Sequence, residues 1–488
     1  MRSNKLYGLS YVVYTGDLDL KQPRLLTASL HLLSGSALGR GFSFLLNLLL
    51  SRALGPAGLG VFNIFLTTVQ TFEVTSQGGL DYGLSCRLLD TEPKSEGYLR
   101  SQSLQALKIL NAFIFLTIIP LVIWLFANQI IFEPITSAFV FIGFSAIIIT
   151  CVCESFASLR WQILLLWGKT KLYALRQGVL LPIKLIAAYL GAVIAGVAGS
   201  ISGYALITAL QNWWLTKKLV FLNPPQSVLN ETRSPKIDLS LIKTGFPLYL
   251  TNTISALVFL PLLGNVALDA GLDDVGYLRI GQLIVQAFTI IPGAILPNLF
   301  IKLRQTKDSE VLDQTEPTLR LIWSGGLLVL LAYLTIDQKL IPLLFGENFI
   351  QSIQPTRVLI LCSVLDSANQ VLHSPLLAKR QVLFFTLAQN GAALLAALVG
   401  FLLIPLMGLT GYLAAKLIFS WAPVIVYCVS FYSKFTSKLL LPFLLTLSAI
   451  LTCLCLIQSI NYLTVISISV VTGLALIIGI IPLRKVFI

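Results

Sequence analysis

The sequence is poor in charged residues, in histidine and in closely spaced cysteines. Only 11% of its 488 residues are charged, whereas soluble proteins carry about 25%. His31 and His373 are its only histidines, so no histidine pair is available for a metal ion, and its seven cysteines include no CxxC spacing. We therefore expect no metal, no cofactor, no catalytic residue and no enzymatic activity.

A nucleotide-binding loop is absent as well. Residues 167–170 include the letters GKT, but Ile163 stands where a phosphate-binding loop requires glycine. The sequence therefore does not indicate an ATPase. Any energy source would have to be an ion gradient or a later reaction that consumes the substrate.

Apolar segments dominate the chain. Of its residues 56% are hydrophobic, and the mean hydropathy is +0.86. Because about 20 apolar residues cross a bilayer as a helix, this composition predicts an all-α polytopic membrane protein with about 14 transmembrane helices. We place them at 26–50, 60–83, 105–127, 134–157, 174–197, 200–221, 244–267, 274–300, 320–345, 355–377, 382–405, 409–432, 439–460 and 463–483.

The positive charges are distributed unequally between the two sides of these segments. With the N-terminus inside, 27 of the 34 lysines and arginines fall on the cytoplasmic side, and only Arg52, Lys339 and Arg357 fall on the other. Cytoplasmic loops of membrane proteins carry such an excess of basic residues. We therefore expect both termini to be cytoplasmic, and the net charge of +13 reflects membrane topology rather than nucleic-acid binding.

The sequence contains an internal repeat. Residues 51–72 align with 267–288 at a constant shift of 216, which pairs Gly55 with Gly271 and Gly60 with Gly276. A second match at a shift of 208 pairs Gly203, Tyr204 and Trp213 with Gly411, Tyr412 and Trp421. These matches predict two six-helix bundles of the same orientation around a central cavity. The expected divisions are an N-terminal cytoplasmic segment (1–24), a first bundle (25–221), a cytoplasmic linker (222–243), a second bundle (244–432) and two additional helices with the C-terminus (433–488).

Polar residues follow helical spacing in the first two segments. One stripe consists of Ser36, Arg40, Ser43, Asn47 and Ser51, and another of Asn63, Thr67, Gln70, Glu73, Gln77 and Asp81. Polar stripes on otherwise apolar helices are expected to face protein or water rather than lipid.

Charged residues lie within several predicted spans. They include the cations Arg40, Lys184, Arg279 and Lys416 and the carboxylates Glu73, Asp81, Glu154 and Asp366. Each costs at least about 2.5 kcal/mol at the centre of a bilayer, so they either pair with one another, reach a headgroup or serve a function. Arg40 and Lys184 lie near the middle of their spans, which favours function. The pattern predicts a water-filled, net cationic cavity suited to an anionic substrate such as a pyrophosphate.

Several stretches resemble a known family. LSRALGPAGLGVFNIFLT, DVGYLRIGQLI, LIPLLFGENFIQSI and IPLMGLTGYLAAKLIFSW are spread along the chain to about residue 432. They are similar to the oligosaccharide-lipid flippases of the multidrug/oligosaccharidyl-lipid/polysaccharide exporter superfamily. The resemblance implies two bundles with alternating access and the transfer of a polyprenyl-pyrophosphate-linked oligosaccharide from the cytoplasmic to the outer leaflet. It also implies a bacterial cytoplasmic membrane location and cooperation with other polysaccharide assembly proteins.

The resemblance extends to the lipid II flippases of this superfamily at one position. They carry an arginine twelve residues before an Arg-x-x-Gly turn, and Arg40 precedes Arg52 by the same distance. Leu46 stands where those proteins have a second arginine, which argues against lipid II as the substrate.

The expected substrate contacts fall into three groups. Pyrophosphate would bind Arg40, Lys184, Arg279 and Lys416, whereas sugar hydroxyls would bind Asn47, Asn63, Gln70, Gln282 and Gln286. Glu73 and Asp366 are candidates for coupling to an ion or proton. The alternative function is a multidrug antiporter of the same superfamily, driven by a proton or sodium gradient, and the excess of cations argues against it. A glycan polymerase would be expected to carry a long outer loop, which the sequence lacks.

Overall fold

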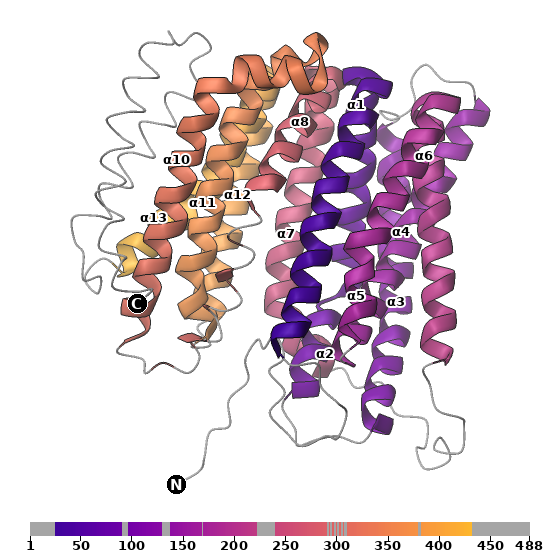
Figure 1. Ribbon diagram of the computed structural model, residues 1–488, viewed down its shortest axis with the longest axis vertical. Helices are drawn as coiled ribbons and strands as arrows, with labels where there is room; N and C mark the ends of the chain where they lie inside the picture. Colours follow the sequence, from indigo (N-terminus) through magenta and orange to yellow (C-terminus); the bar gives the residue numbers. More distant parts are fainter. Residues whose placement is uncertain are drawn as a thin grey trace. The chain divides into compact units, whose positions relative to one another are not determined.

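The computed structural model describes residues 25–89, 96–128, 137–167, 169–221, 240–289, 310–378 and 382–431, with short pieces at 292, 295–296, 299, 302–303 and 306. All regular elements in these residues are helices, which confirms the predicted all-α polytopic architecture (Figure 1). Both helices predicted beyond residue 432 lie outside the described residues. The helices are α1 (Leu25–Gln77), α2 (Leu80–Leu89), α3 (Glu96–Asn128), α4 (Ser137–Leu166), α5 (Thr170–Leu175), the π-helical turn η1 (Arg176–Leu180), α6 (Leu181–Phe221), α7 (Ser240–Asp269), α8 (Leu272–Phe288), α10 (Val311–Phe345), the 3₁₀ turn η3 (Glu347–Ser352), α11 (Ile353–Ala378), α12 (Val382–Met407) and α13 (Leu409–Phe431).

Eight helical stretches among the described residues are long and apolar enough to cross a membrane. Two of them contain a break and therefore hold two predicted segments each. In α1 the break is Gly55 (φ 68°), followed by Pro56, and in α6 it is Ala195–Gly196 (Gly196 φ 59°). Glycine adopts positive φ without steric cost, and proline suits the first turn of the helix that follows. The predicted 26–50 and 60–83 segments thus correspond to two helices that meet at this break, the first and second arms of α1.

The chain divides into two compact units. Unit 1 comprises residues 1–54 and 61–260, and unit 2 comprises 55–60 and 261–488. The divisions therefore fall inside α1 and α7, and the six residues Gly55–Gly60 belong to unit 2 although the chain on either side belongs to unit 1. The predicted division into bundles around a 222–243 linker stays a prediction.

In unit 1, α4 packs against both α3 and α6 (Figure 1). Phe62 and Phe65 of α1 pack edge-on against Tyr204 of α6, with ring centroids 6.3 and 5.6 Å away. The beginning of α7 joins this unit through glycine contacts. Gly79 and Gly245 approach so closely that a Cβ on either would overlap the backbone of the other, and the Tyr249 hydroxyl donates to the Thr75 carbonyl at 3.1 Å.

In unit 2, α11 is the central helix and packs against α8, α10 and α13. Gly281 of α8 lies against Thr356 of α11, and Gly326 of α10 lies against Val364. The Gly55–Gly60 segment packs on the beginning of α8, because a Cβ at Gly60 would overlap the Leu272 carbonyl oxygen and one at Gly276 would overlap that of Pro56. These close backbone contacts fix the rotation of α8 and α11 about their axes, and so determine which of their side chains are accessible.

Candidate functional site

Between residues 61 and 73, the second arm of α1 is accessible only at polar residues. Residues 61–72 are buried except for Thr67, which is half-buried, and Gln70, which is exposed; Glu73 follows as a half-buried residue. Helix α12 shows the opposite pattern, because apolar residues such as Leu387 and Leu398 are exposed, as expected for a face in contact with lipid. A helix that buries its apolar faces and exposes a glutamine is suited to water rather than to hydrocarbon.

The same arrangement recurs on α8 in unit 2. Residues 275–284 are buried apart from Gln282, which is half-buried, and Gln286 is exposed one turn later. Gln286 is also the repeat equivalent of Gln70, at the shift of 216. Two glutamines that the sequence repeat pairs are therefore both accessible, each on a helix that is otherwise mostly buried.

Helix α11 carries a third polar strip. Residues 355–376 are buried except for half-buried Asp366, exposed Gln370 and half-buried His373. These three residues follow helical spacing and share one face. Each unit thus contains a mostly buried helix whose accessible positions are polar.

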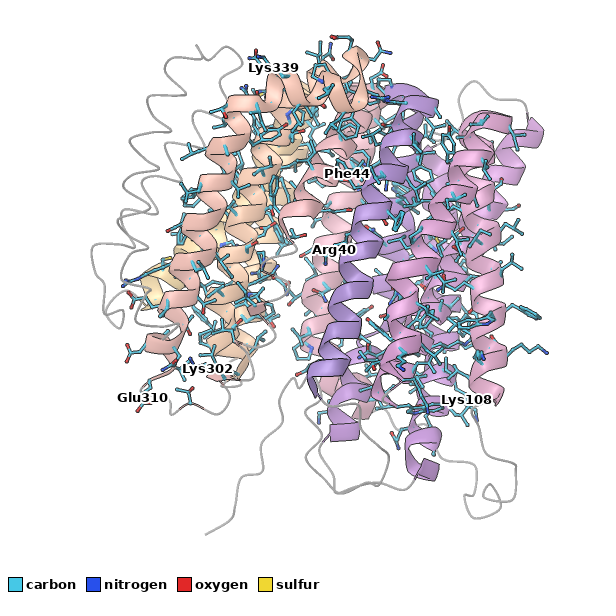
Figure 2. All side chains as sticks on the ribbon, viewed as in Figure 1. Arg40, Phe44, Lys108, Lys302, Glu310 and Lys339 are labelled. Carbon is cyan, nitrogen blue, oxygen red and sulfur yellow. The ribbon has the colours of Figure 1, made fainter. Side chains whose placement is uncertain are left out.

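Arg40 begins a set of polar groups on the first arm of α1 (Figure 2). Ser43, Asn47 and Ser51 of the same stripe are buried, and Arg40 is half-buried. Asn47 donates its amide to the Ser43 carbonyl at 2.7 Å. Within the described residues, Arg40 Nη1, Ser43 Oγ and Asn47 Oδ1 are buried without a hydrogen-bond partner. Buried polar atoms are normally satisfied, so this stripe has hydrogen-bonding capacity left for a ligand.

Lys184 is part of a charge network in unit 1. Its Nζ lies 2.8 and 3.1 Å from the Glu154 carboxylate oxygens and 5.4 Å from the centre of the Tyr204 ring. Glu73 pairs with Arg176 of η1 at 3.6 Å and also interacts electrostatically with Glu154 and Lys184. Four charges, two of each sign, therefore neutralise one another, with η1 supplying Arg176. Lys184 occurs in a buried ion pair, the arrangement that sequence reasoning had weighed against a substrate role.

Lys416 and Asp366 form a second pair, in unit 2. Lys416 Nζ of α13 lies 3.5 Å from Asp366 Oδ2 of α11 and 4.8 Å from the centre of the Phe419 ring. Both side chains are partly accessible. Asp366, the first residue of the α11 strip, thus forms an ion pair with a lysine from a neighbouring helix.

Two further predicted residues, Asn63 and Arg279, lie next to the close helix contacts. Asn63 follows Gly60 by three residues and Arg279 follows Gly276 by three, and both side chains are buried. Arg279 Nη1 donates to Gln282 Oε1 at 3.4 Å. These positions are repeat equivalents, but one carries an amide and the other a guanidinium.

Sequence reasoning missed one buried ion pair. Arg357, near the outer end of the predicted 355–377 span, is in α11, where its Nε donates to Asp337 Oδ2 of α10 at 2.5 Å. Both residues are buried, Asp337 completely. The available signal was helical spacing, because Asp337 follows Leu330 and Tyr333 on one face of α10, and all three are buried. Among the described residues, no three metal-ligating side chains come together.

The fold and these polar strips define a polytopic α-helical membrane protein whose accessible polar faces suit a transporter. No model of a known protein family matches the sequence, and no curated protein matches it either. Solved structures do. A lipid II flippase MurJ in an inward closed conformation superposes with a TM-score of 0.60 over 95% of this chain and 100% of its own, at 15% identity.

Two other solved structures extend this comparison. An inward-facing multidrug resistance MATE family transporter of the MOP superfamily has a TM-score of 0.58, 14% identity and coverage of 83% of this chain and 96% of its own. A MOP superfamily transporter from Pyrococcus furiosus has a TM-score of 0.54 and 13% identity, covering 84% of this chain and 96% of its own. The chain therefore has the fold of the multidrug/oligosaccharidyl-lipid/polysaccharide exporter superfamily, as the sequence resemblance predicts.

Proposed function

We propose that this protein is a flippase that moves a polyprenyl-pyrophosphate-linked oligosaccharide from the cytoplasmic to the outer leaflet of a bacterial cytoplasmic membrane. The observation that carries the proposal is the set of accessible polar residues on otherwise buried helices, namely Gln70 on α1, Gln286 on α8 and Gln370 on α11. Uncharged amides donate and accept hydrogen bonds at once, which matches the hydroxyl groups of a sugar chain. A lipid tail can remain in the bilayer while such groups bind the glycan.

Arg40 is the proposed contact of the pyrophosphate. Its Nη1 has no hydrogen-bond partner among the described residues, whereas Lys184, Arg357 and Lys416 each lie beside a carboxylate. A guanidinium binds phosphate oxygens through two parallel N–H groups, which a lysine cannot reproduce. Asn47 and Asn63 would extend this contact toward the sugar. Lys184, Arg279 and Lys416 would add positive charge if their carboxylate or amide contacts open during transport.

Alternating access would require the helix contacts made by glycine to separate and re-form. Gly60 and Gly276 mark one such contact in unit 2, and Gly79 and Gly245 mark another in unit 1. Contacts without side chains part without leaving a large apolar surface, and Gly55 and Gly271 supply positive-φ turns beside the first. Glu73 and Asp366 would couple the movement to an ion or proton through their ion pairs with Arg176 and Lys416.

Arg40 provides the direct test. The full-length protein is reconstituted in liposomes with a fluorescent polyprenyl-pyrophosphate oligosaccharide, and transfer is followed by access of the glycan to an impermeant lectin. We expect Arg40→Ala to abolish transfer and Arg40→Lys to retain part of it. Arg52→Ala removes an exposed arginine from the same helix and serves as the matched control, which should transfer normally. Full transfer by Arg40→Ala would refute the proposal.

The antiporter alternative makes the opposite prediction. It requires cationic drugs to be the substrates, so a strain lacking the protein would become drug-sensitive and retain normal export of glycan. An arginine with unused hydrogen-bonding capacity on α1 disfavours a cationic substrate. We therefore expect the deletion strain to lose surface glycan and to show unchanged drug resistance.

A further inference from the structure

Aromatic and basic side chains gather where α4 ends, α5 begins and α6 ends. Trp161 of α4 is fully buried and holds the three helices together. Its ring centre lies 6.2 Å from that of Trp214 on α6 and 6.4 Å from that of Tyr173 on α5, the latter edge-on. This aromatic group forms a rigid base for the charges around it.

Two cations are placed by aromatic rings in this region. Lys218 Nζ lies 6.0 Å from the centre of the Trp214 ring, and the Arg160 guanidinium lies 5.2 Å from the centre of the Phe156 ring. Arg160 also donates to Asn212 Oδ1. A cation–π contact favours a cation over the face of an aromatic ring, so the rings fix where these two positive charges lie.

The charge of this stretch has one sign. Between Glu154 and Glu231 the sequence has seven lysines and arginines and no aspartate or glutamate. Lys217 and Lys218 are adjacent at the end of α6, and Lys217 is exposed. Like charges side by side are unfavourable unless an anion offsets them, and this end is the one that the charge distribution assigns to the cytoplasm.

One face of α6 carries apolar residues that are followed, toward the end of the helix, by Lys217. Leu206, Leu210, Trp213 and Lys217 follow one another at steps of four, three and four and therefore share a face. Leu206, Leu210 and Trp213 are 60%, 51% and 62% exposed. Exposed leucines suit acyl chains, tryptophan favours the glycerol level of a bilayer, and lysine lies at the phosphate level. The face repeats the order of chemical groups along a phospholipid.

We infer that this face is a binding site for an anionic phospholipid of the cytoplasmic leaflet. Its acyl chain lies along Leu206 and Leu210, its glycerol backbone lies against Trp213, and its phosphate binds Lys217 and Lys218. Arg160, held by Asn212, adds charge behind them. Basic groups at the ends of membrane helices bind anionic headgroups in this way.

The test uses the full-length protein in detergent, titrated with phosphatidylglycerol or phosphatidylcholine, with bound lipid counted by native mass spectrometry. We expect phosphatidylglycerol to bind about tenfold more tightly than phosphatidylcholine. The variant Lys217→Gln/Lys218→Gln should lose about tenfold in affinity for phosphatidylglycerol, whereas Lys217→Arg/Lys218→Arg should keep it.

A matched variant controls for total charge. Lys243→Gln/Lys302→Gln removes two exposed lysines from the same predicted side, and it should bind phosphatidylglycerol as the parent protein does. Equal affinity for the two lipids, or full binding by Lys217→Gln/Lys218→Gln, would overturn the site. Displacement of the lipid by millimolar glycerol phosphate would assign the lysines to free phosphate instead and would also overturn it. Unfolding temperatures of all variants confirm that they are folded.

Discussion

Gly60 of α1 and Gly276 of α8 occupy equivalent positions in the two repeats, and each packs against the carbonyl of the residue four positions before the other. Gly60 meets Leu272, and Gly276 meets Pro56. Since Pro56 and Leu272 are themselves repeat equivalents at the shift of 216, the contact has local twofold symmetry. The internal repeat found in the sequence is therefore also present in the backbone contacts of the structure.

Substitution of these glycines should destabilise the protein. In Gly60→Ala and Gly276→Ala the new Cβ would overlap a backbone oxygen, and overpacking of this kind typically costs about 1–3 kcal/mol. The unfolding temperature in detergent measures the effect. Gly391→Ala in α12 is the control, because a Cβ there meets nothing within 4 Å and alanine favours helix. An unchanged unfolding temperature in both test variants would show that the contact tolerates a side chain.

Gln70 and Gln286 should be accessible to water within the membrane. We expect Gln70→Cys and Gln286→Cys, in a background without the seven native cysteines, to react with a membrane-impermeant maleimide. Thiols react as thiolates, which do not form in hydrocarbon. Leu387→Cys and Leu398→Cys, at positions on α12 that are also exposed, should stay unlabelled. If both leucine positions were labelled as fast as the glutamine positions, the glutamines could not be assigned to a water-accessible face and the leucines to a lipid-facing one.

The Lys184–Glu154 pair allows stability and transport to be separated. Lys184 is only 3% exposed, so Lys184→Gln or Glu154→Gln alone leaves a buried charge unpaired, and such changes cost about 3–5 kcal/mol. The double variant should recover most of the lost stability in a double-mutant cycle. If Lys184 also binds pyrophosphate, the double variant will be stable but slow in glycan transfer. Normal transfer by it would restrict Lys184 to a structural role.

Membrane orientation can be checked within unit 2. Lys302 and Lys339 lie near opposite ends of this unit (Figure 2), and both are exposed. The charge distribution predicts that Lys339→Cys reacts with an impermeant reagent added outside intact cells, and that Lys302→Cys reacts only after the membrane is opened. The reverse pattern would invert the topology and place both termini outside.

Hydropathy and glycine patterns were sufficient to predict most of the fold. The described parts of the twelve segments predicted between residues 26 and 432 are almost entirely helical, and Gly55 and Gly271 both adopt the positive φ that a turn requires. The sequence did not show how abruptly the chain turns between the two arms of α1. The non-helical backbone is confined to Gly55, and the second arm begins directly with Pro56, which hydropathy does not record.

The candidate site was predicted less completely, because helical spacing defines a face but not its neighbour. Asn63 and Gln70 belong to one predicted stripe, yet Asn63 is buried and Gln70 is exposed. Asn63 lies one turn from the Gly60 contact, whereas Gln70 lies two turns further along. Ion-pair partners such as Lys184 and Glu154 come from different helices, and their distance depends on how each helix is rotated. For the same reason the sequence did not identify Asp337 of α10 as the partner of Arg357.

The position of Gly55–Gly60 in unit 2 has a consequence for how the protein is made. Ribosomes deliver this segment early, but the α8 residues on which it packs are synthesised about 200 residues later. Contacts between such distant parts of a chain form slowly, because a long loop must close first. The Gly55–Gly60 segment is therefore expected to stay unpacked until α8 has been synthesised, and the first half of the protein completes its fold only after the second half has been made.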